Sequence, residues 1–336
     1  MDTKQRQSNL ELCRLASISL IMLLHTTYAV LGPNVGFGVM LLEGFSVIGV
    51  NVFILLTGYF SASPKINSLI NLCFICLFWM IVRIICRYAL GETIDYTYAF
   101  FITKSNWFIA SYIGLLFMTP ILNAFCDSVD KKTLLGVVFV LLVLEIWFNW
   151  LPPWPKVRWG VQNGYSVLSF CILYLLARTI RLCGLPIWFK KFALLIYVLC
   201  SFIIAGLMYV MVNTGHNSPD AVQWLMAYVN PIVIIESVAF FSMFEQLKIQ
   251  SRFINHVAKS TLAVLFGHVA ILTIFCKQFL YIYGHFSGVY LVVYWALSIF
   301  LVFCASIAID QIRILLYAPI EKIIKQKITQ NEIFSK

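Results

Sequence analysis

The chain has 336 residues, of which 61% are hydrophobic and only 11% are charged. A soluble domain usually carries about a quarter charged residues, so this composition excludes an ordinary soluble enzyme. The net charge of +10 is dispersed over short loops, which argues against a nucleic-acid-binding protein.

Apolar runs repeat from one end of the chain to the other, each close to the roughly 20 residues that a helix needs to cross a bilayer. The eighth run has Pro231 near its start and Glu236 inside it. The sequence predicts an all-α integral membrane protein with about ten transmembrane helices in one bundle. The ten runs lie at about 10–32, 37–60, 68–90, 107–126, 133–151, 165–183, 190–213, 227–246, 258–282 and 288–318.

Ten spans place both termini on one side of the membrane, and most of the 24 Lys and Arg residues fall on that side. Loops rich in Lys and Arg stay in the cytoplasm, so we expect both termini to be cytoplasmic. The expected organisation is a cytoplasmic N-terminus at 1–9, a transmembrane domain at 10–318 and a basic cytoplasmic tail at 319–336. The loops assigned to the opposite side carry only Lys104, Lys156, Arg158 and Lys277.

The first predicted span holds an arginine and a histidine, Arg14 and His25, eleven residues apart. Eleven residues are close to three helical turns, so both side chains project from one face, about 16 Å apart along the helix axis. Glu11 lies one turn before Arg14 and is placed to pair with it. One interpretation is that Arg14 anchors the helix at the interface and His25 is a buried structural residue. The other is that a neutral imidazole serves as a general base and the arginine binds an anionic donor.

Other polar residues inside the spans are candidates for a site, because charged side chains are costly at the bilayer centre. Arg83 and Arg87 share one face of the third span and either line a cavity or extend to the interface. Asn51 and His268 are further candidates for substrate or donor binding. Thr57 and Gly58 favour close helix packing. Possible partners for the arginines are Glu43, Glu145 and Glu236.

The ten cysteines lie mostly within predicted spans, and no metal-ligand spacing such as H-E-x-x-H occurs. We therefore expect packing cysteines and no metal site.

Several segments resemble the acyltransferase-3 family of membrane O-acyltransferases. "NLELCRLASISLIMLLHTTY" is similar to the first family helix, whose signature is an arginine, ten residues and a histidine. "GVNVFILLTGYF" is similar to the second-helix motif, with Asn51 and Thr57 as variants of its usual residues. Later segments follow in the family's order: "NWFIASYIGLLFMTPILNAF", "GYSVLSFCILYLLARTIRL", "STLAVLFGHVAIL" and "IDQIRILLYAPI".

The resemblance implies a ten-helix bundle in the cell inner membrane that transfers an acyl group, usually acetyl, from cytoplasmic acetyl-CoA to a sugar hydroxyl. The acceptor would be a cell-surface polysaccharide or its lipid-linked precursor. His25 would be the catalytic base or a transient acyl carrier, and Arg14 would help to hold the donor. Acetyl-CoA would be a co-substrate, with no cofactor permanently bound. The family's basic residues at the start of the third helix are replaced here by Asn67 and Asn71.

Two other functions stay open at this point. The same arginines and histidine would suit a transporter or flippase for a lipid-linked or anionic sugar, and an inactive scaffold for glycan assembly would keep the same fold. The sequence specifies neither the acceptor sugar, nor the acyl group, nor the oligomeric state.

Overall fold

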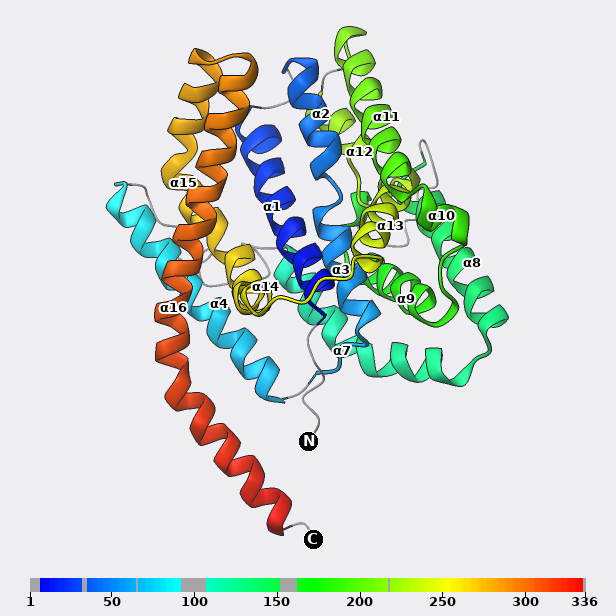
Figure 1. Cartoon of the computed structure of the whole chain (residues 1–336), viewed down its shortest axis with the longest axis vertical. Helices are drawn as coiled ribbons and strands as arrows, with labels where there is room; N and C mark the ends of the chain where they lie inside the picture. Colours follow the sequence, from blue (N-terminus) through cyan, green and yellow to red (C-terminus); the bar gives the residue numbers. More distant parts are fainter. Residues whose placement is uncertain are drawn as a thin grey trace. The chain divides into compact units, whose positions relative to one another are not determined.

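The computed structural model describes residues 7–31, 35–64, 66–91, 107–151, 162–216 and 218–334. Within these ranges every regular element is a helix (Figure 1). The chain forms two compact units, each built from two separate stretches of sequence. Unit 1 comprises Met1–Ser63 and Asn106–Ala258, and unit 2 comprises Pro64–Ser105 and Lys259–Lys336.

Unit 1 contains most of the helices and the predicted first and second spans. Its second predicted span is two helices, α2 and α3, joined by a turn at Val47 and Ile48. The helices of unit 1 are α1 (Ser8–Leu31), α2 (Phe37–Ser46), α3 (Gly49–Tyr59), α7 (Trp107–Ser128), α8 (Lys131–Asn149), the 3-10 turn η1 (Gln162–Gly164), α9 (Val167–Cys183), α10 (Ile187–Lys191), α11 (Ala193–Asn213), α12 (Pro219–Leu225), α13 (Pro231–Glu245) and α14 (Arg252–Val257).

Helix α3 lies at the centre of unit 1, and all of its residues are buried. It is apolar on all sides, as expected for a helix surrounded by others, and it packs against α9, α1 and α13. A Cβ atom at Gly58 would lie 2.5 Å from the Tyr174 carbonyl oxygen of α9. This close approach confirms the packing role predicted for the Thr57–Gly58 pair.

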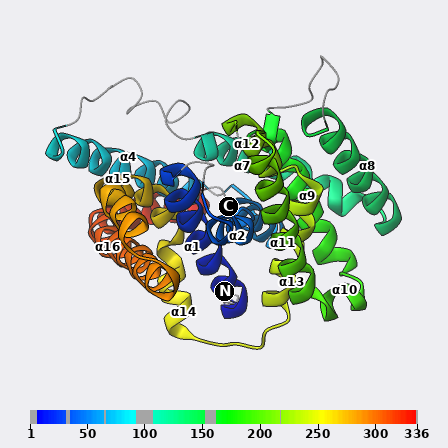
Figure 2. The same ribbon diagram turned by 90° about the horizontal axis from the view of Figure 1, so that it is seen from above.

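Helix α11 packs against α13 and α2 on another side of unit 1 (Figure 2). A Cβ atom at Gly44 of α2 would lie 2.6 Å from the Ser201 carbonyl oxygen of α11. Small residues thus set the helix spacing here too, as is common between helices that pack in a membrane.

Unit 2 is built from three long helices, α4 (Ile66–Ala89), α15 (Thr261–His285) and α16 (Gly288–Phe334), with the short turn η2 (Ala258–Ser260) just before α15. Helix α15 packs against both α16 and α4. Gly267 leaves room for Trp79, whose ring would lie 2.4 Å from an added Cβ atom. Helix α16 continues past residue 318, the expected end of the transmembrane domain, with Pro319 inside it.

Seven helical segments of the described chain are long and apolar enough to cross a membrane. Helices α9 and α13 occupy two of the other expected runs, with only 17 and 15 residues. Helix α15 covers the ninth run and is not among the seven. The structure therefore supports a multi-pass helical membrane protein, and ten crossings with cytoplasmic termini stay a prediction. The seven segments are Ser8–Thr27, Phe37–Tyr59, Ile66–Ala89, Trp107–Ser128, Lys131–Asn149, Ala193–Asn213 and Gly288–Ile324.

Helix α8 has one exposed apolar face and another face that packs against α9. Leu135, Phe139, Val143 and Trp147 recur every four residues and are exposed, so they form an apolar stripe suited to contact with lipid chains. The helix begins after Asp130, whose carboxylate accepts the Thr133 N–H at 3.0 Å. Hydrogen bonding by Thr133 lowers the pKa of the exposed Asp130 carboxyl.

Candidate functional site

The Arg14–His25 face of α1 begins with an ion pair. Arg14 Nη1 donates to Glu11 Oε2 at 3.0 Å, which confirms the pairing predicted from their spacing. The Glu11 side chain is almost buried, whereas 26% of the Arg14 side chain is exposed. The pair fixes one edge of the guanidinium group and leaves the rest of it partly accessible.

His25 lies three turns further along α1 and is half-buried. Its Nδ1 atom is 2.8 Å from the Ile21 carbonyl oxygen. A carbonyl oxygen only accepts hydrogen bonds, so Nδ1 carries the proton, and the lone pair of a neutral ring is on Nε2. Nε2 is therefore the nitrogen through which this histidine can act as a base.

Two isoleucines, Ile18 and Ile21, lie between Arg14 and His25 on the same face, and both are buried. A Cβ atom at Gly49 would lie 2.6 Å from Ile21 Cγ1, so this face of α1 packs against α3. The structure places Arg14 and His25 on one face, but an apolar stretch and about 16 Å of helix separate them. Any ligand that reaches both must be long.

Tyr112 of α7 lies beside the Arg14 end of this face. Its hydroxyl group lies near the Thr57 side chain and interacts electrostatically with Arg14. The Tyr112 ring stacks on Phe108, with ring centroids 5.7 Å apart. Tyr112 was not among the predicted site residues, because nothing in the local sequence distinguishes it from the many other aromatic residues of the spans.

Asn51 of α3 is fully buried and forms a hydrogen bond with a segment far away in the sequence. Its Nδ2 atom donates to the Tyr228 carbonyl oxygen at 2.9 Å. Its Oδ1 atom is buried and has no hydrogen-bond partner among the described residues. Asn51 therefore acts through hydrogen bonds, as an uncharged amide must.

An aromatic cluster surrounds Tyr228, between the starts of α7, α9 and α13. Trp107 packs against Tyr165, Tyr228 and Phe170, at centroid distances of 4.5, 5.6 and 6.0 Å. Tyr165 also contacts Tyr228 edge-on, at 5.3 Å. Trp107, Tyr165 and Tyr228 were not among the predicted site residues, since only the fold brings these three segments together.

Two of the three carboxyl groups predicted as partners for the arginines, all buried inside unit 1, accept hydrogen bonds from hydroxyl groups of neighbouring helices. Glu145 accepts a hydrogen bond from Ser169, and Glu236 accepts one from Ser201 at 2.5 Å. Glu43 is fully buried beside Thr27. A small cavity with room for about one water molecule adjoins Glu145 and Ser169. Ser169, Asn149 and Ser201, not arginines, are thus the donors found for Glu145 and Glu236 within the described part of the unit, and neither Glu43 oxygen has a hydrogen-bond partner there.

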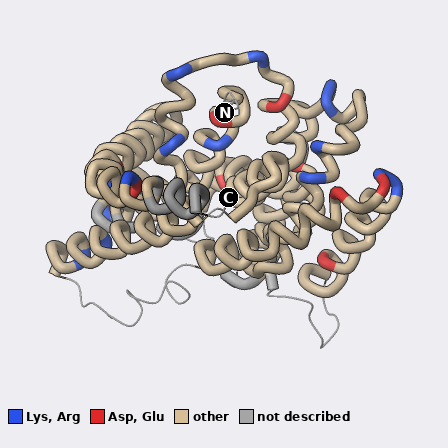
Figure 3. The backbone as a smooth tube through the Cα atoms, turned by 90° about the horizontal axis from the view of Figure 1, so that it is seen from below, with Lys and Arg blue, Asp and Glu red and all other residues tan. Residues whose placement is uncertain are grey.

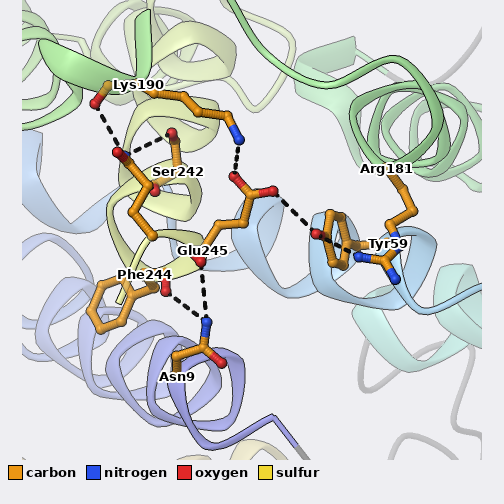
Figure 4. Close-up of polar contacts among 8 residues, drawn as sticks. Asn9, Tyr59, Arg181, Lys190, Ser242, Phe244 and Glu245 are labelled. Atoms are coloured by element: carbon orange, nitrogen blue, oxygen red, sulfur yellow. Dashed lines mark hydrogen bonds and ion pairs between the residues drawn. The ribbon is translucent and has the colours of Figure 1, made fainter. Parts of the chain in front are cut away.

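The end of unit 1 where α1 begins carries a charged network, which we call the charged end (Figures 3 and 4). Arg181 Nη1 donates to the Tyr59 hydroxyl at 2.9 Å, and that hydroxyl donates to Glu245 Oε1 at 3.1 Å. Lys190 Nζ lies 2.9 Å from Glu245 Oε2. Asn9 of α1 donates to the Glu245 carbonyl oxygen at 3.3 Å. Basic residues that are dispersed in the sequence therefore gather at the end of the unit nearest Arg14.

The remaining predicted site residues belong to unit 2. Arg83 and Arg87 are half-buried on α4. His268 is buried on α15, and its Nδ1 atom is 3.2 Å from the Val264 carbonyl oxygen. Their membership of a common site with His25 stays a prediction.

No protein-family model matches the chain, and no curated protein or solved structure compared with it matches either.

Proposed function

We propose that this chain is an integral-membrane O-acyltransferase. It would transfer an acetyl group from cytoplasmic acetyl-CoA to a sugar hydroxyl of a cell-surface polysaccharide or its lipid-linked precursor. The main support is the Arg14–His25 face of α1. There a partly exposed arginine lies near the charged end, and a histidine with its lone pair on Nε2 lies three turns away.

The donor would enter from the charged end. Under the positive-inside rule this end faces the cytoplasm, where acetyl-CoA is made. Arg14 would bind the donor phosphates with the part of its guanidinium that Glu11 leaves accessible. Because acetyl-CoA carries its thioester at the end of a long, unbranched arm, about 16 Å between Arg14 and His25 suits such a ligand. The arm would have to displace or pass Ile18 and Ile21.

The reaction needs one base and one acyl acceptor. His25 Nε2 would take the proton of the sugar hydroxyl while the hydroxyl oxygen attacks the thioester carbonyl carbon. The carbon–sulfur bond then breaks, and the departing thiolate takes the proton from His25. The products are an acetyl ester and free CoA. If Nε2 attacks the thioester itself, the acetyl group passes through an acetyl-imidazole before it reaches the sugar.

The test compares His25→Ala with His256→Ala, a matched change at an exposed histidine of α14. We expect His25→Ala to lower acetyl transfer from labelled acetyl-CoA to surface glycan by about 100- to 10,000-fold, the usual contribution of a general base. His256→Ala should retain wild-type transfer. Membrane levels of both variants are checked by immunoblotting.

Normal glycan acetylation by a stably expressed His25→Ala variant would contradict the proposal. Movement of lipid-linked sugar across the membrane by the wild type, without acetyl transfer, would favour the transporter instead.

A further inference from the structure

Two buried amide oxygens next to Tyr228 have no hydrogen-bond partner among the residues that the structure describes. One is Asn51 Oδ1 on α3, and the other is Asn163 Oδ1 in the turn η1. Both residues also hold the Tyr228 backbone. Asn51 Nδ2 donates to its carbonyl oxygen at 2.9 Å, and the Asn163 carbonyl oxygen accepts its N–H at 3.0 Å. The Asn51–Tyr228 bond fixes which end of the Asn51 amide is oxygen.

Buried acceptors without partners are unusual, because each costs about 1–3 kcal/mol unless a donor satisfies it. Two of them flank one residue here, so each is a place for a donor from water or from a ligand.

The backbone around Tyr228 is irregular although it is buried. Residues 226–230 connect α12 to α13 without forming a helix, and all five are buried. Asn163 has a φ of +69°, in the left-handed region. In membrane proteins, irregular backbone inside the bundle occurs where it is buried in protein or lines a cavity. Such a segment suits a binding site better than a lipid-facing surface.

The rings beside these amides suit one class of ligand. Trp107 and Tyr165 are half-buried, and they flank Tyr228. No lysine or arginine is found among the described partners of this cluster, and carbonyl oxygens repel anions. A phosphate-bearing group such as the head of acetyl-CoA is therefore a poor fit. A sugar offers several hydroxyl donors on a ring whose C–H faces can pack against aromatic side chains.

We propose that Asn51, Asn163 and the rings of Trp107 and Tyr165 form a subsite that binds a neutral sugar, with its hydroxyl groups donating to the two free amide oxygens. This inference rests on the proposed function, for which it supplies the acceptor site. The subsite is connected to the Arg14–His25 face through α3, since Gly49 packs on Ile21 and Asn51 follows two residues later. His25 lies one turn beyond Ile21.

Asn163→Gly tests the subsite with the least disturbance, because glycine accepts the positive φ and the backbone still holds Tyr228. The control is Asn213→Gly, at an exposed asparagine at the end of α11. The acceptor is glycan prepared from cells that lack this protein, and the enzyme is the purified full chain.

We expect Asn163→Gly to raise the KM for this glycan about 3- to 10-fold, the effect of one lost hydrogen bond. The KM for acetyl-CoA should be unchanged, and Asn213→Gly should leave both KM values at the wild-type level. An unchanged KM for glycan would overturn the subsite, and so would equal increases in both KM values, since these would indicate a general structural defect.

A binding measurement separates the failure of this subsite from failure of the proposed function. Fragments of the same glycan are titrated into the wild type and Asn163→Gly while tryptophan fluorescence is recorded. If the wild type fails to cleave acetyl-CoA but binds the fragments, and Asn163→Gly binds them 3- to 10-fold more weakly, the sugar subsite stands without the transferase. If the wild type binds no fragment, or both proteins bind equally well, the subsite is wrong and the two amide oxygens are satisfied by water alone.

Discussion

Each unit contains an arginine paired with an acid three residues earlier on its own helix, yet the two pairs differ in what the arginine can still do. In unit 2, Arg313 of α16 binds both oxygens of Asp310, and its Nη1 atom donates to Asn71 at 3.2 Å. Asp310 and Arg313 are buried. In unit 1, Arg14 makes a single contact with Glu11 and keeps 26% of its side chain exposed.

The comparison separates a structural arginine from one that is available to a ligand. All three nitrogens of the Arg313 guanidinium have protein partners, so little is left for a substrate. Arg14 retains donors with no described partner and stands near the charged end. Equal spacing in the sequence therefore does not imply an equal role, since burial and the number of contacts decide it.

The largest expected effect follows from removing the buried arginine. Arg313→Ala leaves Asp310 buried without its cation, which should lower the free energy of unfolding by about 3–5 kcal/mol. Thermal melting of the purified protein in detergent, followed by tryptophan fluorescence, measures this loss. The double variant Asp310→Asn with Arg313→Gln should recover most of it. A loss below about 1 kcal/mol for Arg313→Ala would remove the distinction between the two pairs.

Arg14→Ala should affect donor binding strongly and stability little, the reverse of what we expect for Arg313→Ala. Because the pair is partly exposed, we expect stability to fall by no more than about 1 kcal/mol. The KM for acetyl-CoA should rise at least about tenfold, because a hydrogen bond to a charged group contributes roughly 1.5–3 kcal/mol. Arg14→Lys should lie between the wild type and Arg14→Ala, since lysine keeps the charge but lacks the planar fork. If the KM for acetyl-CoA stays at the wild-type value in Arg14→Ala, Arg14 does not bind the donor.

Glu11→Gln should have the smallest effect of the three. It removes the negative charge that competes with donor phosphates for Arg14, so the KM for acetyl-CoA should fall slightly, by less than about threefold. The free energy of unfolding of Glu11→Gln, measured in the same way as for Arg313→Ala, should change by less than about 1 kcal/mol. A rise in KM as large as that of Arg14→Ala would instead show that Glu11 orients the arginine.

The helical membrane class was predictable because it depends on composition and on the length of apolar runs. The Glu11–Arg14 pair was predictable for a similar reason, since residues three apart on a helix are neighbours whatever the rest of the chain does. The packing role of Gly58 also followed from the local sequence. The boundaries of spans were less accurate: the second run is two helices, and the runs at 165–183 and 227–246 form the short helices α9 and α13.

Contacts between distant segments were not predictable. Nothing near Asn51 in the sequence points to Tyr228, and Asn71 gives no sign that an arginine 242 residues away donates to it. The glutamates inside the spans were considered as partners for Arg83 and Arg87, but Glu145 and Glu236 bond serines from other helices.

The sequence by itself determined the helical membrane class and the placing of Arg14 and His25 on one face, because apolar composition and helical periodicity are local properties. The tertiary structure alone decided which arginine is fully bonded and which stays accessible. It also decided which amide oxygens near Tyr228 lack a partner among the described residues. Burial and hydrogen-bond partners depend on segments far apart in the chain, and only folding brings those together.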